Sequence, residues 1–278
     1  MLAYPFMVNA LEAGTTVAIM AGVAGWFMTL RRQTFAGHTL SLIAFPGAAA
    51  AALAGLPAAV GYFGFCGIGA LALGRIAGST QGHASESAAT GTLQAFALAL
   101  GFLFVSLYHG ILSGLDSLLF GTFLGITRGQ VVALVAVAAV TVALTGLAAR
   151  PLLFASVDPE VARGGGVPVT ALGFGFLLLL GLAVAETSQI TGALLVFALL
   201  VTPAATAHEL TSRPWLGIAL SVALALAVTW LGLILAYYSI YPVGFYITSL
   251  SFGGYVLVRV GRATVRRRVA RPSFETAH

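Results

Sequence analysis

Long apolar runs recur along this chain and leave little room for a soluble domain between them. Each has about the length of a membrane-spanning helix, which needs roughly 20 apolar residues. Only 8% of the residues are charged, against about a quarter in soluble proteins. We therefore predict an all-α, polytopic transmembrane helical bundle of about nine spans, within a range of eight to ten, at 6–30, 39–55, 57–74, 88–108, 130–153, 169–187, 191–208, 215–238 and 243–259.

The arginines predict the orientation of these spans. All 13 basic residues counted as Lys or Arg are arginine. If the N-terminus lies outside, only Arg128 is external and every other arginine is cytoplasmic, as the positive-inside rule requires. We expect an external N-terminus, a cytoplasmic C-terminus, a transmembrane domain over 1–260 and a basic cytoplasmic tail over 261–278. The polar segment 78–91 is expected to be a cytoplasmic loop.

Missing residues and motifs exclude several functions. The chain has no lysine, so it cannot form the phosphate-binding loop GxxxxGK[ST], and any ATP must bind another chain. The pair His208-Glu209 begins like the zinc-protease motif HExxH, but Ser212 stands in the last position. The arginines flank apolar runs, which favours membrane topology over nucleic-acid binding. An enzyme and a nucleic-acid partner are therefore not expected.

One polar insert, SVDPEVARGGGVPV at 156–169, interrupts the apolar pattern. Asp158 suits a helix N-cap, Pro159 the first helical position and Glu160 the first turn, while the glycines through Gly166 favour a helix end. The pattern predicts about two turns of helix on the cytoplasmic surface. An ordinary capped connector is the alternative interpretation.

Five segments, in order, resemble the permease subunits of zinc/manganese-type ABC importers. The resemblance implies a homodimer in the bacterial inner (cytoplasmic) membrane, a cytoplasmic ABC ATPase under each protomer and an extracytoplasmic substrate-binding protein. It implies a transported divalent metal, no permanently bound cofactor, and ATP on the partner subunit. The segments are RRQTFAGHTLSLIAFPGAA (31–49), LLFGTFLGIT (118–127), the DPE insert, GALLVFALLVTPAATA (192–207) and YYSIYPVG (237–244).

In such a permease the polar insert is the coupling helix, which seats in a cleft of the ATPase. The resemblance implies that Asp158, Pro159 and Glu160 fix its start. Arg163 would face the ATPase, and Gly166 would let the chain turn back into the next span.

The chain departs from the family in its second span. The family pairs an Asp with a His four residues later, on one helical face, and here those positions hold His38 and Leu42. His38 remains a candidate metal ligand on the transport pathway, with Ser41 one turn away, and favours Zn²⁺ over Mn²⁺. A solvated helix-end histidine is the alternative. The loss of the pair also leaves open a permease for a non-metal or chelated substrate, or an ion-coupled secondary transporter.

Further residues are candidates for the transport pathway or for docking of the binding protein. Glu12 and Glu186 are the acids nearest the membrane core, where ionisable groups are often functional. Together with Asp116 in the outer loop they could draw a cation toward the mouth; the alternative is that all three acids are interfacial and hydrated. Pro203 is expected to kink the seventh span beside the pathway. Arg128, with Asp116 in the same outer region, is a candidate docking point for the binding protein; an interfacial arginine that only marks the membrane edge is the alternative.

Overall fold

The computed structural model describes residues 4–79, 83–108, 121, 125–193 and 195–269. In that part all elements of regular secondary structure are helices. Eight helices are long and apolar enough to cross a membrane. They are α1 (Pro5–Leu30), α2 (Thr34–Leu53), α3 (Ala58–Ser79), α4 (His83–Leu107), α6 (Arg128–Val157), α8 (Val169–Thr191), α11 (Pro214–Tyr237) and α12 (Val243–Val269). The predicted all-α transmembrane bundle is confirmed.

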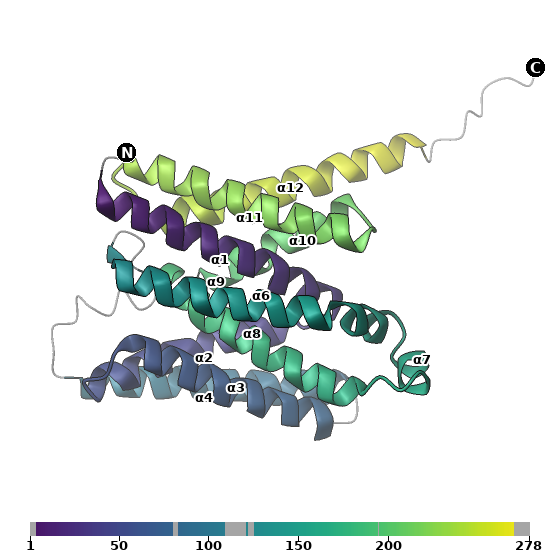
Figure 1. Ribbon diagram of the computed structural model, residues 1–278, viewed down its shortest axis with the longest axis horizontal. Coiled ribbons are helices and arrows are strands. Elements are labelled where there is room, and N and C mark those ends of the chain that lie inside the picture. Colours follow the sequence, from purple (N-terminus) through teal and green to yellow (C-terminus); the bar gives the residue numbers. More distant parts are fainter. Residues whose placement is uncertain (1–3, 80–82, 109–120, 122–124, 194, 270–278) are drawn as a thin grey trace, which may run out of the picture.

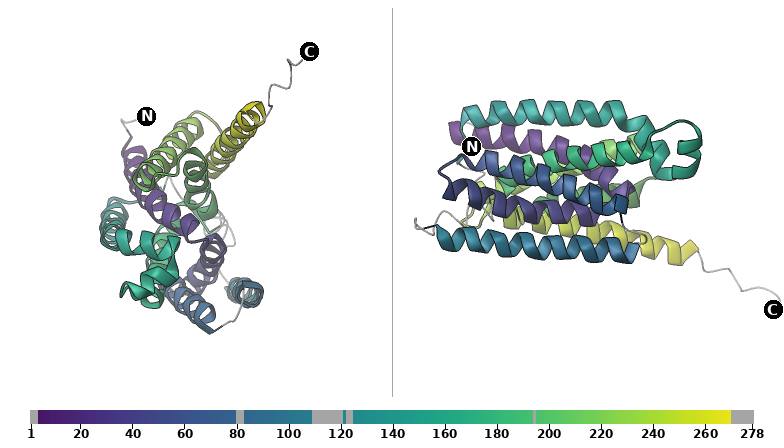
Figure 2. Two further views of the ribbon diagram at one scale, coloured as in Figure 1. Left: turned by 90° about the vertical axis from the view of Figure 1, so that its right-hand side faces the viewer. Right: turned by 90° about the horizontal axis from the view of Figure 1, so that it is seen from below.

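The long helices form two groups joined by a middle layer. Helices α2, α3 and α4 lie together on one side and α1, α11 and α12 on the other, with α6 and α8 between them (Figure 1). Seen from below, α6 lies along one edge of the bundle, and α4 and α12 lie along the opposite edge (Figure 2). The short helices α9 (Val196–Leu200) and α10 (Thr202–Leu210) lie in the interior, where they pack on α1 and α12.

Glycines set the closest helix approaches. A Cβ on Gly61 of α3 would lie 2.0 Å from the carbonyl oxygen of Gly47 in α2, and one on Gly25 of α1 would lie 2.0 Å from the carbonyl oxygen of Leu200 in α9. No larger residue fits at either contact. Small residues that allow backbones to approach in this way are a common basis of helix association in lipid.

The predicted seventh span, 191–208, is not one helix. It consists of α9, five residues long, and α10, nine residues long, with a break at Val201. Pro203 follows at the start of α10, where it lacks the amide needed to continue a helix from α9. Helix α8 ends at one end of the bundle and α11 begins at the other (Figure 1). The broken pair therefore carries the chain across between them.

Two polar segments are more helical than the sequence predicts. Helix α4 begins at His83, so much of the expected loop 78–91 is helix, and α12 continues past residue 260 as far as Val269. Apolar runs mark only the part of a helix that lies in hydrocarbon. Outside the hydrocarbon a helix does not need apolar side chains, because water solvates the polar ones. Alanine, serine and arginine can therefore continue the helical backbone there.

The orientation can be tested with two cysteines at opposite ends of the bundle. Gly129 at the start of α6 and Gly164 at the end of α7 are exposed, and an added Cβ meets no atom within 4 Å at either site. We expect Gly129→Cys to react with an impermeant thiol reagent in intact cells and Gly164→Cys to react only after permeabilisation, because the arginines favour the α7 end as cytoplasmic. The native Cys66 is buried and should stay silent. The reverse pattern would overturn the orientation.

Candidate functional site

The polar insert forms a short capped helix, α7 (Pro159–Gly164), between α6 and α8. The Asp158 carboxylate accepts hydrogen bonds from the backbone amides of Glu160 at 3.1 Å and Val161 at 3.0 Å. Pro159 occupies the first turn, and Gly166 turns the chain with a φ of +83°. The predicted start and stop signals are confirmed, and the helix is slightly shorter than the two turns predicted.

Helix α7 presents most of its side chains to the surroundings. Ala162 is fully buried and anchors the helix on the bundle, whereas Glu160, Val161 and Arg163 are exposed. Val161 exposes 58% of its surface even though it is apolar. Helix α7 projects at one end of the bundle (Figure 1). A short rigid helix with a mixed apolar and charged outer face is suited to contact another protein.

His38 lies in the second turn of α2, half-buried against α9. Its ring meets the ring of Phe197 edge to face, with 5.3 Å between centroids. Its Nδ1 atom is buried and has no hydrogen-bond partner. A buried ring nitrogen without a partner is unfavourable and needs an explanation. His38 therefore keeps a nitrogen available in the interior, beside the broken crossing.

Ser41 does not supply a free ligand next to His38. Its hydroxyl is buried and donates to the backbone carbonyl of His38 at 2.7 Å. Leu42, where the family has a histidine, is also nearly buried. In the part of the chain that the structure describes, no three His, Cys, Asp or Glu side chains gather as a potential metal site. The described part of the chain thus offers a single imidazole at this point of α2.

Glu186 is the most deeply buried acid among the described residues. Its exposed fraction is 0%, and neither carboxyl oxygen has a hydrogen-bond partner. Hydration at the membrane interface, the alternative interpretation, does not describe this side chain. A carboxyl group in such a place is costly unless something pairs with it. Its neighbours Thr187 and Ser188 use their hydroxyls on backbone carbonyls one turn earlier.

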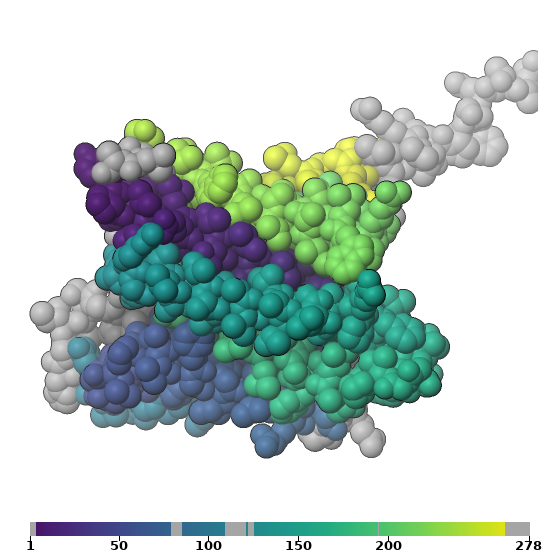
Figure 3. All heavy atoms as spheres, viewed as in Figure 1, coloured from purple at the N-terminus to yellow at the C-terminus, as the bar shows by residue number. Residues whose placement is uncertain are grey.

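A cavity of about 460 Å³ opens between α3, α6 and α8, close to Glu186 along α8. Tyr62, Gln130 and Gln189 are among its lining residues, and Gln189 follows Glu186 by three positions. Helices α3 and α6 lie at the surface on the face shown in Figure 3. Glu186 itself does not line the cavity, so in this conformation the carboxyl group is closed off from it.

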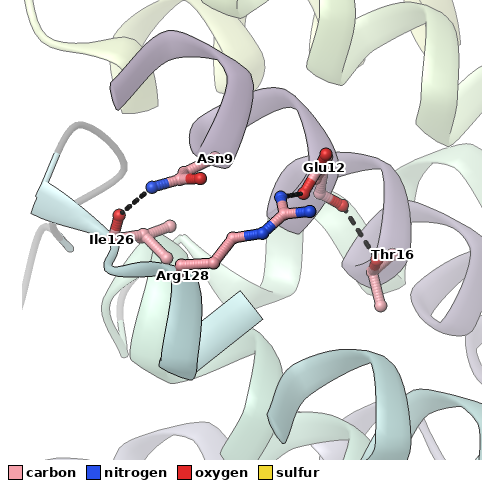
Figure 4. A network of polar contacts seen from close by, with 5 residues as sticks. All are labelled: Asn9, Glu12, Thr16, Ile126 and Arg128. Carbon is pink, nitrogen blue, oxygen red and sulfur yellow. Dashed lines mark hydrogen bonds and ion pairs between the residues drawn. The ribbon is translucent and has the colours of Figure 1, made fainter. Parts of the chain in front are cut away.

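Glu12 and Arg128 form an ion pair, so two residues predicted to act separately contact each other (Figure 4). The pair joins α1 to the start of α6. Beside it, the Asn9 amide donates to the carbonyl of Ile126 at 3.1 Å. Both charged side chains are partly exposed, so Glu12 is accessible to water, unlike Glu186. Asp116 lies outside the described residues.

Pro203 is buried at the start of α10, next to the break at Val201. Val201 keeps helical dihedral angles, its amide donates to the Phe197 carbonyl at 2.9 Å, and its carbonyl accepts the Ala205 amide at 2.8 Å, so the junction of α9 and α10 is a local irregularity beside Pro203. At the far end of α10, His208 stacks on Trp26 with 4.9 Å between ring centroids, and its Nε2 lies 3.1 Å from the Trp26 carbonyl. His208 thus attaches α10 to α1.

Sequence reasoning missed two residues that the structure brings into the site. Phe197 packs on His38, and Arg31, counted only as a topology marker, contacts both α6 and α8. Among described residues, no hydrogen bond or ion pair joins Glu186 to His38 or Glu12. A phenylalanine in an apolar run carries no signal of its own. Arg31 does carry a sequence signal, because it is a charged residue that adjoins two predicted spans.

The eight long apolar helices define a multi-pass membrane protein of the all-helical class. The chain matches the ABC 3 transport family over residues 3–260 and belongs to that family. This decides against the ion-coupled secondary transporter.

Named relatives and one solved structure agree with this assignment. The manganese transport system membrane protein MntC of Halalkalibacterium halodurans is 33% identical over 77% of this chain and 72% of its own length. A probable iron transport system membrane protein of Haemophilus influenzae is 30% identical over 85% of this chain and 86% of its own length. A chain of PsaBC from Streptococcus pneumoniae in complex with Fab superposes with a TM-score of 0.82 at 27% identity. The superposition covers 92% of this chain and 91% of that chain.

Proposed function

We propose that this chain is the membrane permease of a bacterial ABC importer for a divalent transition metal, driven by ATP hydrolysis on a separate chain. The observation that carries the proposal is α7, an exposed helix fixed by its own cap at the end of the bundle that the arginines predict to be cytoplasmic. The names of the relatives, which include manganese and iron transport proteins, supply the substrate class. In this proposal Asp158, Pro159, Glu160, Arg163 and Gly166 form the coupling joint, in the inner membrane.

His38 is the proposed metal contact. One protomer supplies one imidazole, so a homodimer with α2 near its axis would supply two. Imidazole nitrogen suits Zn²⁺ better than Mn²⁺, which prefers oxygen ligands, whereas the names of several relatives favour manganese. Glu186 would add a negative charge on the route, meeting the cation when the cavity between α3, α6 and α8 opens to it. Pro203 and the break at Val201 would let α9 move.

The proposal is tested by reconstituting the permease in vesicles with the ATPase and binding protein encoded nearest to it. ATP hydrolysis should be stimulated by the metal-loaded binding protein, and radiolabelled Zn²⁺ or Mn²⁺ should accumulate. Competition between the two metals gives the preference. Stimulation by a metal chelate or an organic substrate, with none by free metals, would replace the metal proposal with the alternative of a chelated or non-metal substrate.

Arg128 is proposed to contact an acidic residue of the binding protein. Its ion pair with Glu12 adds a requirement to this proposal. A docking carboxylate would have to take the place of Glu12 on the guanidinium. Arg128→Ala should then weaken docking several-fold, most at low ionic strength, where charges are least screened. Glu12→Gln should preserve or strengthen it. Unchanged affinity of Arg128→Ala at low salt, measured by surface plasmon resonance, would limit Arg128 to joining α1 and α6.

A further inference from the structure

Arg31 lies in the short turn between α1 and α2, at the same end of the bundle as α7. It is the C-cap residue of α1, and the turn that it begins is tight, because Arg32 adopts a φ of +57°. Arg32 is exposed, but Arg31 is half-buried, and burial lowers the pKa of its guanidinium from the ordinary value. A desolvated cation in a turn needs partners.

The partners of Arg31 on one side are the two helices that hold α7. Its Nη1 donates to the Ser156 hydroxyl near the end of α6 at 3.4 Å, and its guanidinium lies 5.4 Å above the centre of the Phe176 ring in α8. Gly173 gives it room, since a Cβ there would lie 3.3 Å from Nη2. Ser156 precedes the α7 cap, Asp158, by two residues. Arg31 therefore contacts both the helix that precedes the coupling joint and the helix that follows it.

On its other side Arg31 contacts the beginning of α2. Its Nε donates to Gln33 Oε1 at 3.4 Å, and Gln33 is the N-cap residue of α2. The Gln33 carbonyl in turn accepts the amide of Gly37 at 3.0 Å. The next residue is His38, which packs on Phe197. One side chain thus connects the supports of α7 to the helix turn that carries the interior histidine.

We propose that Arg31 is the positioning residue that transmits movement of α7 to α2, and so links ATP hydrolysis to the state of the route beside His38. Both of its hydrogen bonds are near the long limit for such bonds. Its charge and its contact with the Phe176 ring therefore carry much of the link. This inference rests on the proposed function, because it assumes that an ATPase moves α7.

The test measures how much metal enters per ATP hydrolysed in the reconstituted complex. With Arg31→Gln, hydrolysis should continue while Zn²⁺ or Mn²⁺ uptake falls, lowering the ratio roughly tenfold, within the span of typical coupling free energies. Arg32→Gln, next in the chain but exposed, should keep the wild-type ratio. A wild-type ratio in Arg31→Gln, or an equal fall in hydrolysis and uptake, would overturn the proposal.

Two more variants keep the test decisive. Arg31→Lys retains a charge but not the planar group that stacks on Phe176, so its ratio of metal uptake to ATP hydrolysis should lie between those of wild type and Arg31→Gln. If Arg31→Gln assembles poorly, the ratio of Arg31→Lys should still fall below that of wild type. Ser156→Ala should lower the ratio less than Arg31→Gln does. Combining the two changes should lower the ratio little further than Arg31→Gln alone, because both remove the same contact. Fully additive losses would contradict that contact. Failure of the proposed function is distinct, since the wild-type complex would then show no metal uptake.

Discussion

Reversing both charges of α7, with Glu160→Arg and Arg163→Glu in one variant, is expected to abolish metal uptake while membrane abundance stays normal. Both side chains are exposed, and the Asp158 cap that forms the helix is left in place. The swap keeps the net charge and costs only about 1 kcal/mol against the helix dipole. It inverts the pattern presented to a docked ATPase, where like charges brought together cost several kcal/mol.

A matched control exists at the same end of the bundle. Glu209 in α10 and Arg262 in α12 form an ion pair at 3.6 Å, also partly exposed. Exchanging them, with Glu209→Arg and Arg262→Glu, preserves the pair and should leave uptake near the wild-type rate. Co-purification with the ATPase and radiolabelled uptake are measured for both variants. Normal ATPase binding and uptake in the α7 variant would show that α7 is only a connector between α6 and α8.

Replacing His38 by leucine is expected to reduce metal uptake by at least about tenfold, with the complex still assembled. Leucine fills a similar space against Phe197, so packing should survive. It removes the imidazole, whose buried Nδ1 has no partner, and even the loss of a group that only supports a metal ligand costs about 10- to 100-fold in affinity or activity. His38→Asp should retain uptake, with a preference moved toward Mn²⁺ because carboxylate oxygen suits that ion.

The control for His38 is Ser41→Ala. The Ser41 hydroxyl bonds only to the backbone of its own helix, so its loss should change uptake little. Uptake of Zn²⁺ and Mn²⁺ is followed in vesicles for each variant. Wild-type uptake by His38→Leu would make His38 a packing partner of Phe197 alone, and would favour a substrate that needs no imidazole, such as a metal chelate.

The long helices were predictable because hydrocarbon imposes one requirement on every span. A helix there needs about 20 apolar residues, whatever its neighbours are. The helix ends were less predictable, since His83 and Val269 lie in polar sequence that remains helical outside the bilayer. Pro203 predicted an irregularity in the seventh span, but an apolar run conceals that the segment consists of two short helices meeting at Val201.

The same division holds for the candidate site. The cap of α7 depends on residues two and three positions apart, so the order Asp, Pro, Glu was sufficient to predict it. The contact between Glu12 and Arg128 joins residues 116 positions apart, and that between Arg31 and Ser156 joins residues 125 apart. Helix packing brings such pairs together, and neither composition nor spacing in a single sequence encodes which helix faces which.

The broken crossing has a consequence for the biogenesis of the protein. Together α9 and α10 span roughly 22 Å if fully helical, less than the roughly 30 Å of hydrocarbon, so the pair is a poor substrate for insertion on its own. Its neighbours include α11 and α12, which follow it in the chain. Stable integration of this segment must therefore wait until both later helices have been synthesised and have packed against it.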